Sequence, residues 1–159
     1  MPAVKPASRA YKVDIGMRIG AALIDAATGF ILGLIFLLWG GQWRLLTLLL
    51  TGLYMLLRDG LPISALDYQS VGKKLLKLHV ENEKTHKPRI DMALSAKRNA
   101  TLAGGLLLAP VLGLVGGGIG IVVALLASVG LAVFEVMLVL KDPNGLRFGD
   151  KLAGTKVLD

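Results

Sequence analysis

The chain contains no cysteine among its 159 residues. Disulfide bonds, thiolate metal sites, thiol nucleophiles and lipidated cysteines are therefore excluded. Charged residues are also scarce, at 18%, whereas 54% of the residues are hydrophobic and the mean hydropathy is +0.65. Two long tracts, Ile19–Leu57 and Ala100–Leu140, carry almost no charge. This composition is typical of segments that span a lipid bilayer.

The two apolar tracts are each long enough for a pair of membrane helices. The first begins too late and runs too far to be the apolar part of a secretory signal, so we expect it to stay in the protein as helix. An aromatic-flanked turn at Trp39–Trp43 and the glycines Gly116–Gly118 divide the tracts. The sequence therefore predicts an all-α membrane protein with four transmembrane helices in two hairpins. The helices are expected at Ile15–Leu38, Trp43–Leu57, Ala100–Val115 and Ile119–Leu140.

The formal net charge of +7 comes from 18 Lys and Arg against 11 Asp and Glu. The basic residues lack the interleaved aromatics and the basic helix face of a nucleic-acid site, so nucleic acid is not an expected partner. Only Arg44 lies at a predicted outer turn. The other Lys and Arg lie on the opposite side of the predicted helices. This uneven distribution predicts a multi-pass protein of the cytoplasmic membrane with both termini in the cytosol. Its expected partners are the lipid bilayer and the anionic lipid headgroups of the cytosolic face.

The chain reads as one domain, 1–159, with an internal repeat. Residues 71–80 match residues 148–157, and Arg58-Asp59 matches Lys141-Asp142 in order. The halves, about 15–80 and 92–157, would have the same topology and form a parallel repeat about an axis along the membrane normal. A cytosolic loop is expected over 58–98, and the strand-like tails of the two halves could pair there. Chance, together with the common needs of cytosolic helix ends, is the alternative explanation.

Two acidic residues fall inside the predicted helices. Asp25 lies about 9 Å inside the first apolar run at ~1.5 Å per residue, and such acids usually face a bundle interior or cavity. Arg18, seven residues earlier, shares its helix face within roughly 20° and is the expected partner. Glu135 lies at a similar depth in the fourth helix. These residues are candidates for ion, proton or ligand binding. Alternatively, Asp25 forms a structural ion pair with Arg18 or Arg98, and Glu135 reaches water.

A second group of candidates lies at the cytosolic helix ends: Asp59, Asp142, Asp150 and Arg98. The three aspartates could cap helices or pair with Lys and Arg, or they could bind a ligand. The two histidines stand alone, no phosphate-binding loop is present, and no nucleophile lies beside a base. We therefore predict no metal site, no cofactor and no enzymatic activity.

Three segments resemble the RDD family of membrane proteins: Arg18–Asp25, Gln69–Val80 and Gly149–Val157. The family is named for one arginine and two aspartates. Arg18 and Asp25 match the first two, and Asp150 matches the second aspartate better than Asp59 does. The resemblance covers nearly the whole chain and implies transport of a ligand, cation/proton exchange included.

Two functions follow from these features. The acid inside a span favours transport or permeation of an ion or small solute, with Asp25 as the proton or ion carrier. The small number of polar residues available to line a path favours a non-transporting scaffold, which would bind other proteins or anionic lipid through its basic loop. Because four short spans form a small bundle, a permeation path would call for a homo-oligomer.

Overall fold

The computed structural model describes residues 14–37 and 43–158. Most of the predicted turn at Trp39–Trp43 lies outside these residues. The elements in chain order are α1 (Ile15–Leu37), α2 (Trp43–Leu57), the 3₁₀ helix η1 (Ser64–Leu66), α3 (Val71–Leu75), β1 (His79–Asn82), α4 (Met92–Lys141), α5 (Phe148–Ala153) and β2 (Thr155–Leu158).

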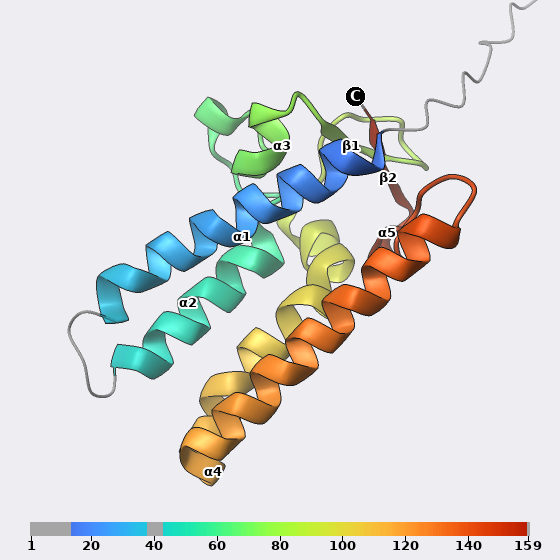
Figure 1. Ribbon diagram of the computed structural model, residues 1–159. Coiled ribbons are helices and arrows are strands. Elements are labelled where there is room, and N and C mark those ends of the chain that lie inside the picture. Colours follow the sequence, from blue (N-terminus) through green and yellow to red (C-terminus); the bar gives the residue numbers. More distant parts are fainter. Residues whose placement is uncertain (1–13, 38–42, 159) are drawn as a thin grey trace, which may run out of the picture.

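The protein is mostly helical, with two hairpins of long helices (Figure 1). In the described part of the chain, α1 and α4 are long and apolar enough to cross a membrane, and α2 contains a shorter apolar helix. Helix α4 bends back on itself at Gly117, whose φ of 58° and ψ of −143° are not helical. Only glycine adopts such angles readily. The predicted turn at the glycine run is therefore confirmed, and it divides α4 into a first arm, 92–116, and a second arm, 118–141.

The first arm of α4 begins at Met92, more than two helical turns before the predicted start at Ala100. Asp91 is its N-cap, and the Asp91 side chain accepts a hydrogen bond from the Leu94 amide at 2.7 Å. This cap satisfies an amide that has no partner within the helix, so the helix extends into the polar segment.

Small residues let the long helices approach closely. A Cβ on Gly33 of α1 would lie 2.8 Å from side-chain atoms of Thr47 and Thr51 on α2. On α2, a Cβ on Gly52 would lie 2.8 Å from the Leu107 side chain of α4. Helix α2 is therefore packed between α1 and the first arm of α4, as small residues allow in membrane helices.

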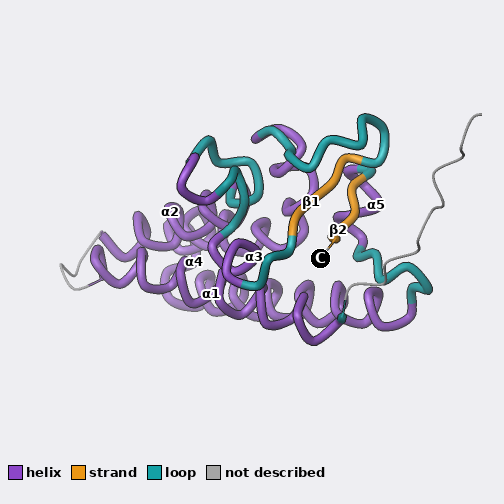
Figure 2. The backbone as a smooth tube through the Cα atoms, turned by 90° about the horizontal axis from the view of Figure 1, so that it is seen from above, coloured by secondary structure: helices purple, strands orange, loops and turns teal. Residues whose placement is uncertain are grey.

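The short elements gather at the end of the molecule away from the Gly117 turn (Figures 1 and 2). We call this the polar end, residues 58–91 and 142–158. There β1 and β2 pair antiparallel with Val80 opposite Val157, which confirms the predicted pairing of the two tails. Leu78 and Val157 are buried with Ala21 of α1, so this two-stranded sheet packs on the first helix. Both strands are short, and the sheet depends on that packing.

Two glycines fix the short helices α3 and α5 against the long ones. A Cβ on Gly72 would lie 2.0 Å from the backbone oxygen of Ala21, and a Cβ on Gly149 would lie 1.9 Å from that of Arg98. Any other residue would push the short helix away from its support. The glycines therefore determine where the polar side chains beside them lie.

Candidate functional site

Asp25 is fully buried and is held by two elements that follow α1 in the chain. One carboxylate oxygen accepts a hydrogen bond from the Gly72 amide at 2.7 Å, and the other lies 3.2 Å from the Arg58 guanidinium at the end of α2. The expected pairing of Asp25 with Arg18 or Arg98 is wrong. Arg18 lies two turns, about 10 Å, along the same helix, whereas α2 and α3 bring their groups directly alongside the carboxylate.

Arg18 turns instead to the last short helix. Its guanidinium lies 2.7 Å from Asp150 and donates to the backbone oxygen of Gly145. Asp150 also contacts Arg98 at 2.7 Å and Arg147 at 3.3 Å. Three arginines from three segments therefore surround one carboxylate that is fully buried. Asp150, the preferred match to the second family aspartate, is the acid that meets Arg18.

Arg98 links this corner to the first half of the chain. Besides Asp150 it contacts Asp59 at 3.1 Å, and Asp59 in turn pairs with Lys73 of α3. The Asn99 amide also donates to Asp59 at 3.1 Å. We call the six residues joined in this way the charge network: Arg18, Lys73, Arg98, Arg147, Asp59 and Asp150. Charges of opposite sign alternate along it, as buried charges require.

The network shifts the ionisation of its members at the polar end. Burial lowers the pKa of Lys73 to about 8, against the opposing pull of Asp59. Burial alone would raise the pKa of Asp59, but Lys73 and the neighbouring arginines hold it well below its ordinary value. The same balance of burial against arginine holds the pKa of Asp150 below its ordinary value. Both acids therefore remain ionised throughout the physiological range.

Glu135 and Asp142 have separate partners. Glu135 is 3% exposed, accepts a hydrogen bond from the Phe148 amide at 2.9 Å, and is also bonded by the Thr101 hydroxyl. The expectation that Glu135 reaches water is therefore wrong, because the start of α5 covers it. Asp142 lies 2.5 Å from Lys151 and accepts from amides of the following turn, which confirms its predicted role at a helix end.

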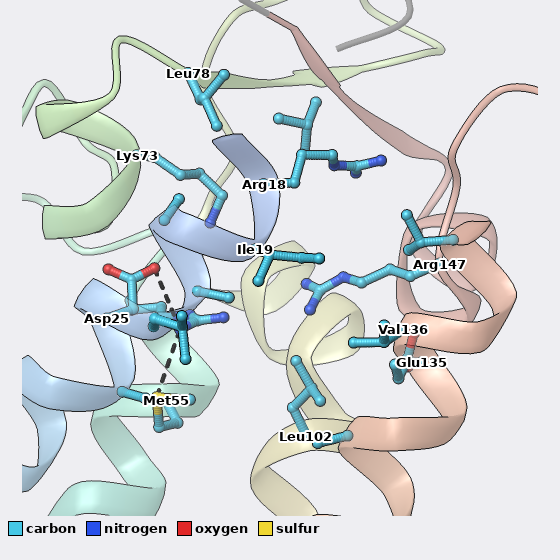
Figure 3. A pocket seen from close by; sticks show the side chains of 18 of the residues that line it. Arg18, Ile19, Asp25, Met55, Lys73, Leu78, Leu102, Glu135, Val136 and Arg147 are labelled. Carbon is cyan, nitrogen blue, oxygen red and sulfur yellow. Dashed lines mark hydrogen bonds and ion pairs between the residues drawn. The ribbon is translucent and has the colours of Figure 1, made fainter. Parts of the chain in front are cut away.

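A cavity of about 320 Å³ lies between α1 and the second arm of α4, at the level of these charges. Asp25 and Lys73 lie on the side of α1 and α3, and Glu135 and Arg147 lie on the side of α4 and α5 (Figure 3). Asp25 and Glu135 therefore face one space, although Asp25 is bonded by residues 58 and 72 and Glu135 by residues 101 and 148. The charged residues of the lining are Arg18, Asp25, Arg58, Lys73, Arg98, Glu135 and Arg147.

The remaining walls of the cavity are apolar. Ile19 and Leu23 of α1 line one side, and Val136 and Val139 of α4 line the other. A cavity with apolar walls and a few converging polar groups is the usual form of a small-molecule site. Within the described residues, no group of three or more His, Asp or Glu side chains could hold a metal ion.

Sequence reasoning missed three residues of the site: Arg58, Lys73 and Arg147. Each is the basic residue next to a motif that had been recognised. Arg58 precedes Asp59 at a helix end, Lys73 follows Gly72, and Arg147 stands two residues before Gly149. Their positions in or beside these motifs could have identified them as site residues. The motifs do not indicate, however, which acidic residue each basic residue contacts.

Comparison with known proteins relates the chain to one family. The sequence model of the RDD family matches residues 12–154, which include both hairpins and the whole charge network. No curated protein and no solved structure matches the chain. Together with the helices long and apolar enough to cross a bilayer, the match identifies a membrane protein. The chain therefore belongs to the RDD family.

Proposed function

We propose that the protein crosses the cytoplasmic membrane four times and moves an ion or small solute through the cavity between α1 and the second arm of α4. The observation that carries this proposal is the cavity itself, because its charged lining comes from both hairpins. A cargo bound there would contact both halves of the molecule. Carriers that alternate between two openings place their site in this way.

The surfaces of the long helices support four spans. Val115 and Ile119, on either side of the Gly117 turn, are 86% and 79% exposed, which suits lipid and not water. Each arm of α4 is roughly 36 Å long at ~1.5 Å per residue, enough for the hydrocarbon core. Helix α2 has 15 residues and is the shortest span. A short span is accommodated by local thinning of the bilayer.

The location of the basic residues supports the proposed orientation. Helix α1 begins at the polar end, and β2 ends the described chain there (Figures 1 and 2). The exposed basic residues of the 58–98 loop lie at this end, among them Lys84, Lys87 and Arg89. By the positive-inside rule, the polar end and both termini are cytosolic.

Corresponding contacts in the two halves support the parallel repeat. Helices begin at Ile15 and Met92, and in each case the aspartate just before accepts a hydrogen bond from an amide of the first turn. The same number of residues separates Gly72 from Gly149 and Ala21 from Arg98. Gly72 lies against the backbone of Ala21, and Gly149 lies against that of Arg98. These shared contacts at one spacing favour a repeat over a chance match.

The register of the sheet has the symmetry that a twofold repeat requires. Val80 and Val157, related by the same spacing, lie opposite each other. The pair His79 and Leu158 is converted by that spacing into the pair of Lys156 and Glu81, which is also present. We therefore propose that the twofold axis passes between the two valines, with one hairpin on each side.

The charges of the lining favour a cargo with negative charge over a free cation. Five basic side chains and two acids face the cavity, and both acids are already bonded within their own halves. Proton coupling remains part of the proposal, with Asp25 as the proton carrier and Arg58 as its partner.

Flux in sealed liposomes tests this proposal. Vesicles loaded with a pH dye would be placed under gradients of sodium, potassium, chloride or inorganic phosphate. We expect a pH change with wild type under at least one gradient, and its loss in Asp25→Asn. Asp67→Asn is the matched control, because Asp67 is half exposed and its ion pair is with the exposed Lys74. If wild type gives no pH change under any of the four gradients, proton-coupled transport of these ions is rejected.

A non-enzymatic scaffold is the second candidate, and the charge network favours it. Every acid of the network has a basic partner, which is also what a purely structural cluster would show. Such a protein would assemble with itself or with other proteins at its basic polar end. A scaffold that assembles with itself predicts a homo-oligomer in detergent by light scattering, together with absence of flux in the liposome assay.

A further inference from the structure

The cavity lies between α1 and the second arm of α4. The corresponding interface, between α2 and the first arm of α4, is closely packed. Helix α2 packs directly on the first arm of α4, where Gly52 meets Leu107. In the proposed repeat, the counterpart of that contact is α1 against the second arm of α4, and there the structure has a cavity of about 320 Å³. The molecule therefore has a cavity in its lateral surface, which in the proposed membrane orientation lies near the cytosolic side.

The outer part of this cavity is suited to acyl chains. Leu23 of α1 is 66% exposed and Val136 of α4 is 41% exposed, and both line the cavity. In the proposed orientation these side chains face the bilayer. A molecule entering between them would pass from lipid into the cavity without crossing water.

The inner part offers a donor that has no acceptor within the described structure, the Nε of Arg58. Arg58 is 2% exposed and lines the cavity, and within the described structure its Nε has no hydrogen-bond partner. Its contact with Asp25 is an ion pair at 3.2 Å, and the carboxylate oxygen concerned also lacks a hydrogen bond. Buried guanidinium groups normally have all their donors engaged, and a phosphate oxygen is a matching acceptor.

We propose that this cavity binds the phosphate of an anionic phospholipid from the cytosolic leaflet, with the headgroup at Arg58 and the acyl chains leaving between α1 and the second arm of α4. The volume suits a headgroup but not the chains, which remain in the bilayer. The surplus of basic groups in the lining selects anionic over zwitterionic lipid. This inference rests on the proposed function in its membrane orientation and names a ligand class for the same cavity.

Native mass spectrometry of the protein released from nanodiscs tests it. Nanodiscs of equal phosphatidylglycerol and phosphatidylcholine would be used, and the ratio of the two lipids retained on the protein would be measured. We expect wild type to retain phosphatidylglycerol preferentially. Arg58→Gln should reduce that preference about tenfold, the factor that loss of one charge-assisted hydrogen bond implies. Arg89→Gln, an exposed position that removes the same charge, should leave it unchanged.

A second variant separates lipid binding from folding. Ala132→Phe places a ring in the apolar wall and leaves every charge in place. It should retain the wild-type melting temperature in detergent and lose the retained lipid. Equal retention of both lipids by wild type would overturn the inference, as would full retention in Ala132→Phe. Displacement of the lipid by glycerol 3-phosphate would also overturn it, because the ligand would then be a soluble phosphate ester.

The failure of this inference can be distinguished from failure of the transport proposal. Ion flux would be measured in vesicles of phosphatidylcholine alone. Undiminished flux there, with no preference for anionic lipid in the nanodiscs, would overturn lipid binding and leave transport standing. Preferential retention of phosphatidylglycerol by a protein that moves no ion would support lipid binding and reject transport.

Discussion

Replacing Asp150 with asparagine removes one charge while nearly preserving shape, and we expect it to destabilise the protein strongly. Asp150 is fully buried and lies 2.7 Å from both Arg18 and Arg98. Two unit charges about 4 Å apart attract by about 4 kcal/mol at an effective dielectric constant of 20, and part of this offsets desolvation. Removing one partner of a buried pair costs about 3–5 kcal/mol, because the remaining charges stay buried without compensation.

The loss is measurable by unfolding in mixed micelles. Wild type and Asp150→Asn would be titrated with SDS in a mild detergent and followed by circular dichroism. Asp67→Asn, at a half-exposed ion pair, should cost no more than about 1 kcal/mol. A double-mutant cycle with Arg18→Gln should give a coupling energy of at least about 1 kcal/mol. If Asp150→Asn unfolds at the same SDS fraction as Asp67→Asn, the buried network does not stabilise the fold, and our reasoning fails.

Three further predictions concern the backbone and pH. Gly149→Ala should lower the free energy of unfolding by about 1–3 kcal/mol, since its Cβ would lie 1.9 Å from a backbone oxygen of α4. Gly130→Ala, with open space around it, should not destabilise the protein in the same SDS titration. Gly117→Ala should lower the melting temperature in detergent, because its backbone angles cost other residues about 1–3 kcal/mol. Asp59 and Asp150 have pKa values held below normal, so they stabilise the fold above their ordinary pKa of about 4. That stability is lost as pH falls toward the folded values. Melting curves should therefore change little between about pH 7 and 5 and drop below about pH 4, less steeply in Asp150→Asn.

The long elements were predictable because their signals are local. The bounds of α2 agree with the prediction, and α1 begins at the predicted Ile15 and continues to Leu37, where this described part of the chain ends. The turn at Gly117 was predictable because three consecutive glycines interrupt an apolar tract that is too long for one membrane span. The pairing of β1 with β2 was inferred from their matching places in the two halves. The predictions of the helices and of the turn use period, length or composition within one segment, and the pairing of the strands uses the comparison of two segments.

The partners of the buried charges were not predictable in the same way. Spacing on one helix suggested that Asp25 pairs with Arg18, but each residue is approached by a different short helix. Helices α3 and α5 have only five and six residues, too few to be stable alone, so nothing local predicts them. They exist because glycines allow them to pack against α1 and α4. Which base meets which acid depends on that packing.

The antiparallel pair of β1 and β2 imposes an order on assembly. Strand β1 is complete about 70 residues before its partner, a delay of roughly 4–15 s at about 5–20 residues per second. During that interval β1 presents open edges, which are a template for pairing with another chain. Two copies synthesised side by side could therefore exchange strands, each lending its β2 to the other's β1. The same four residue pairs would then hold together two molecules in place of two halves.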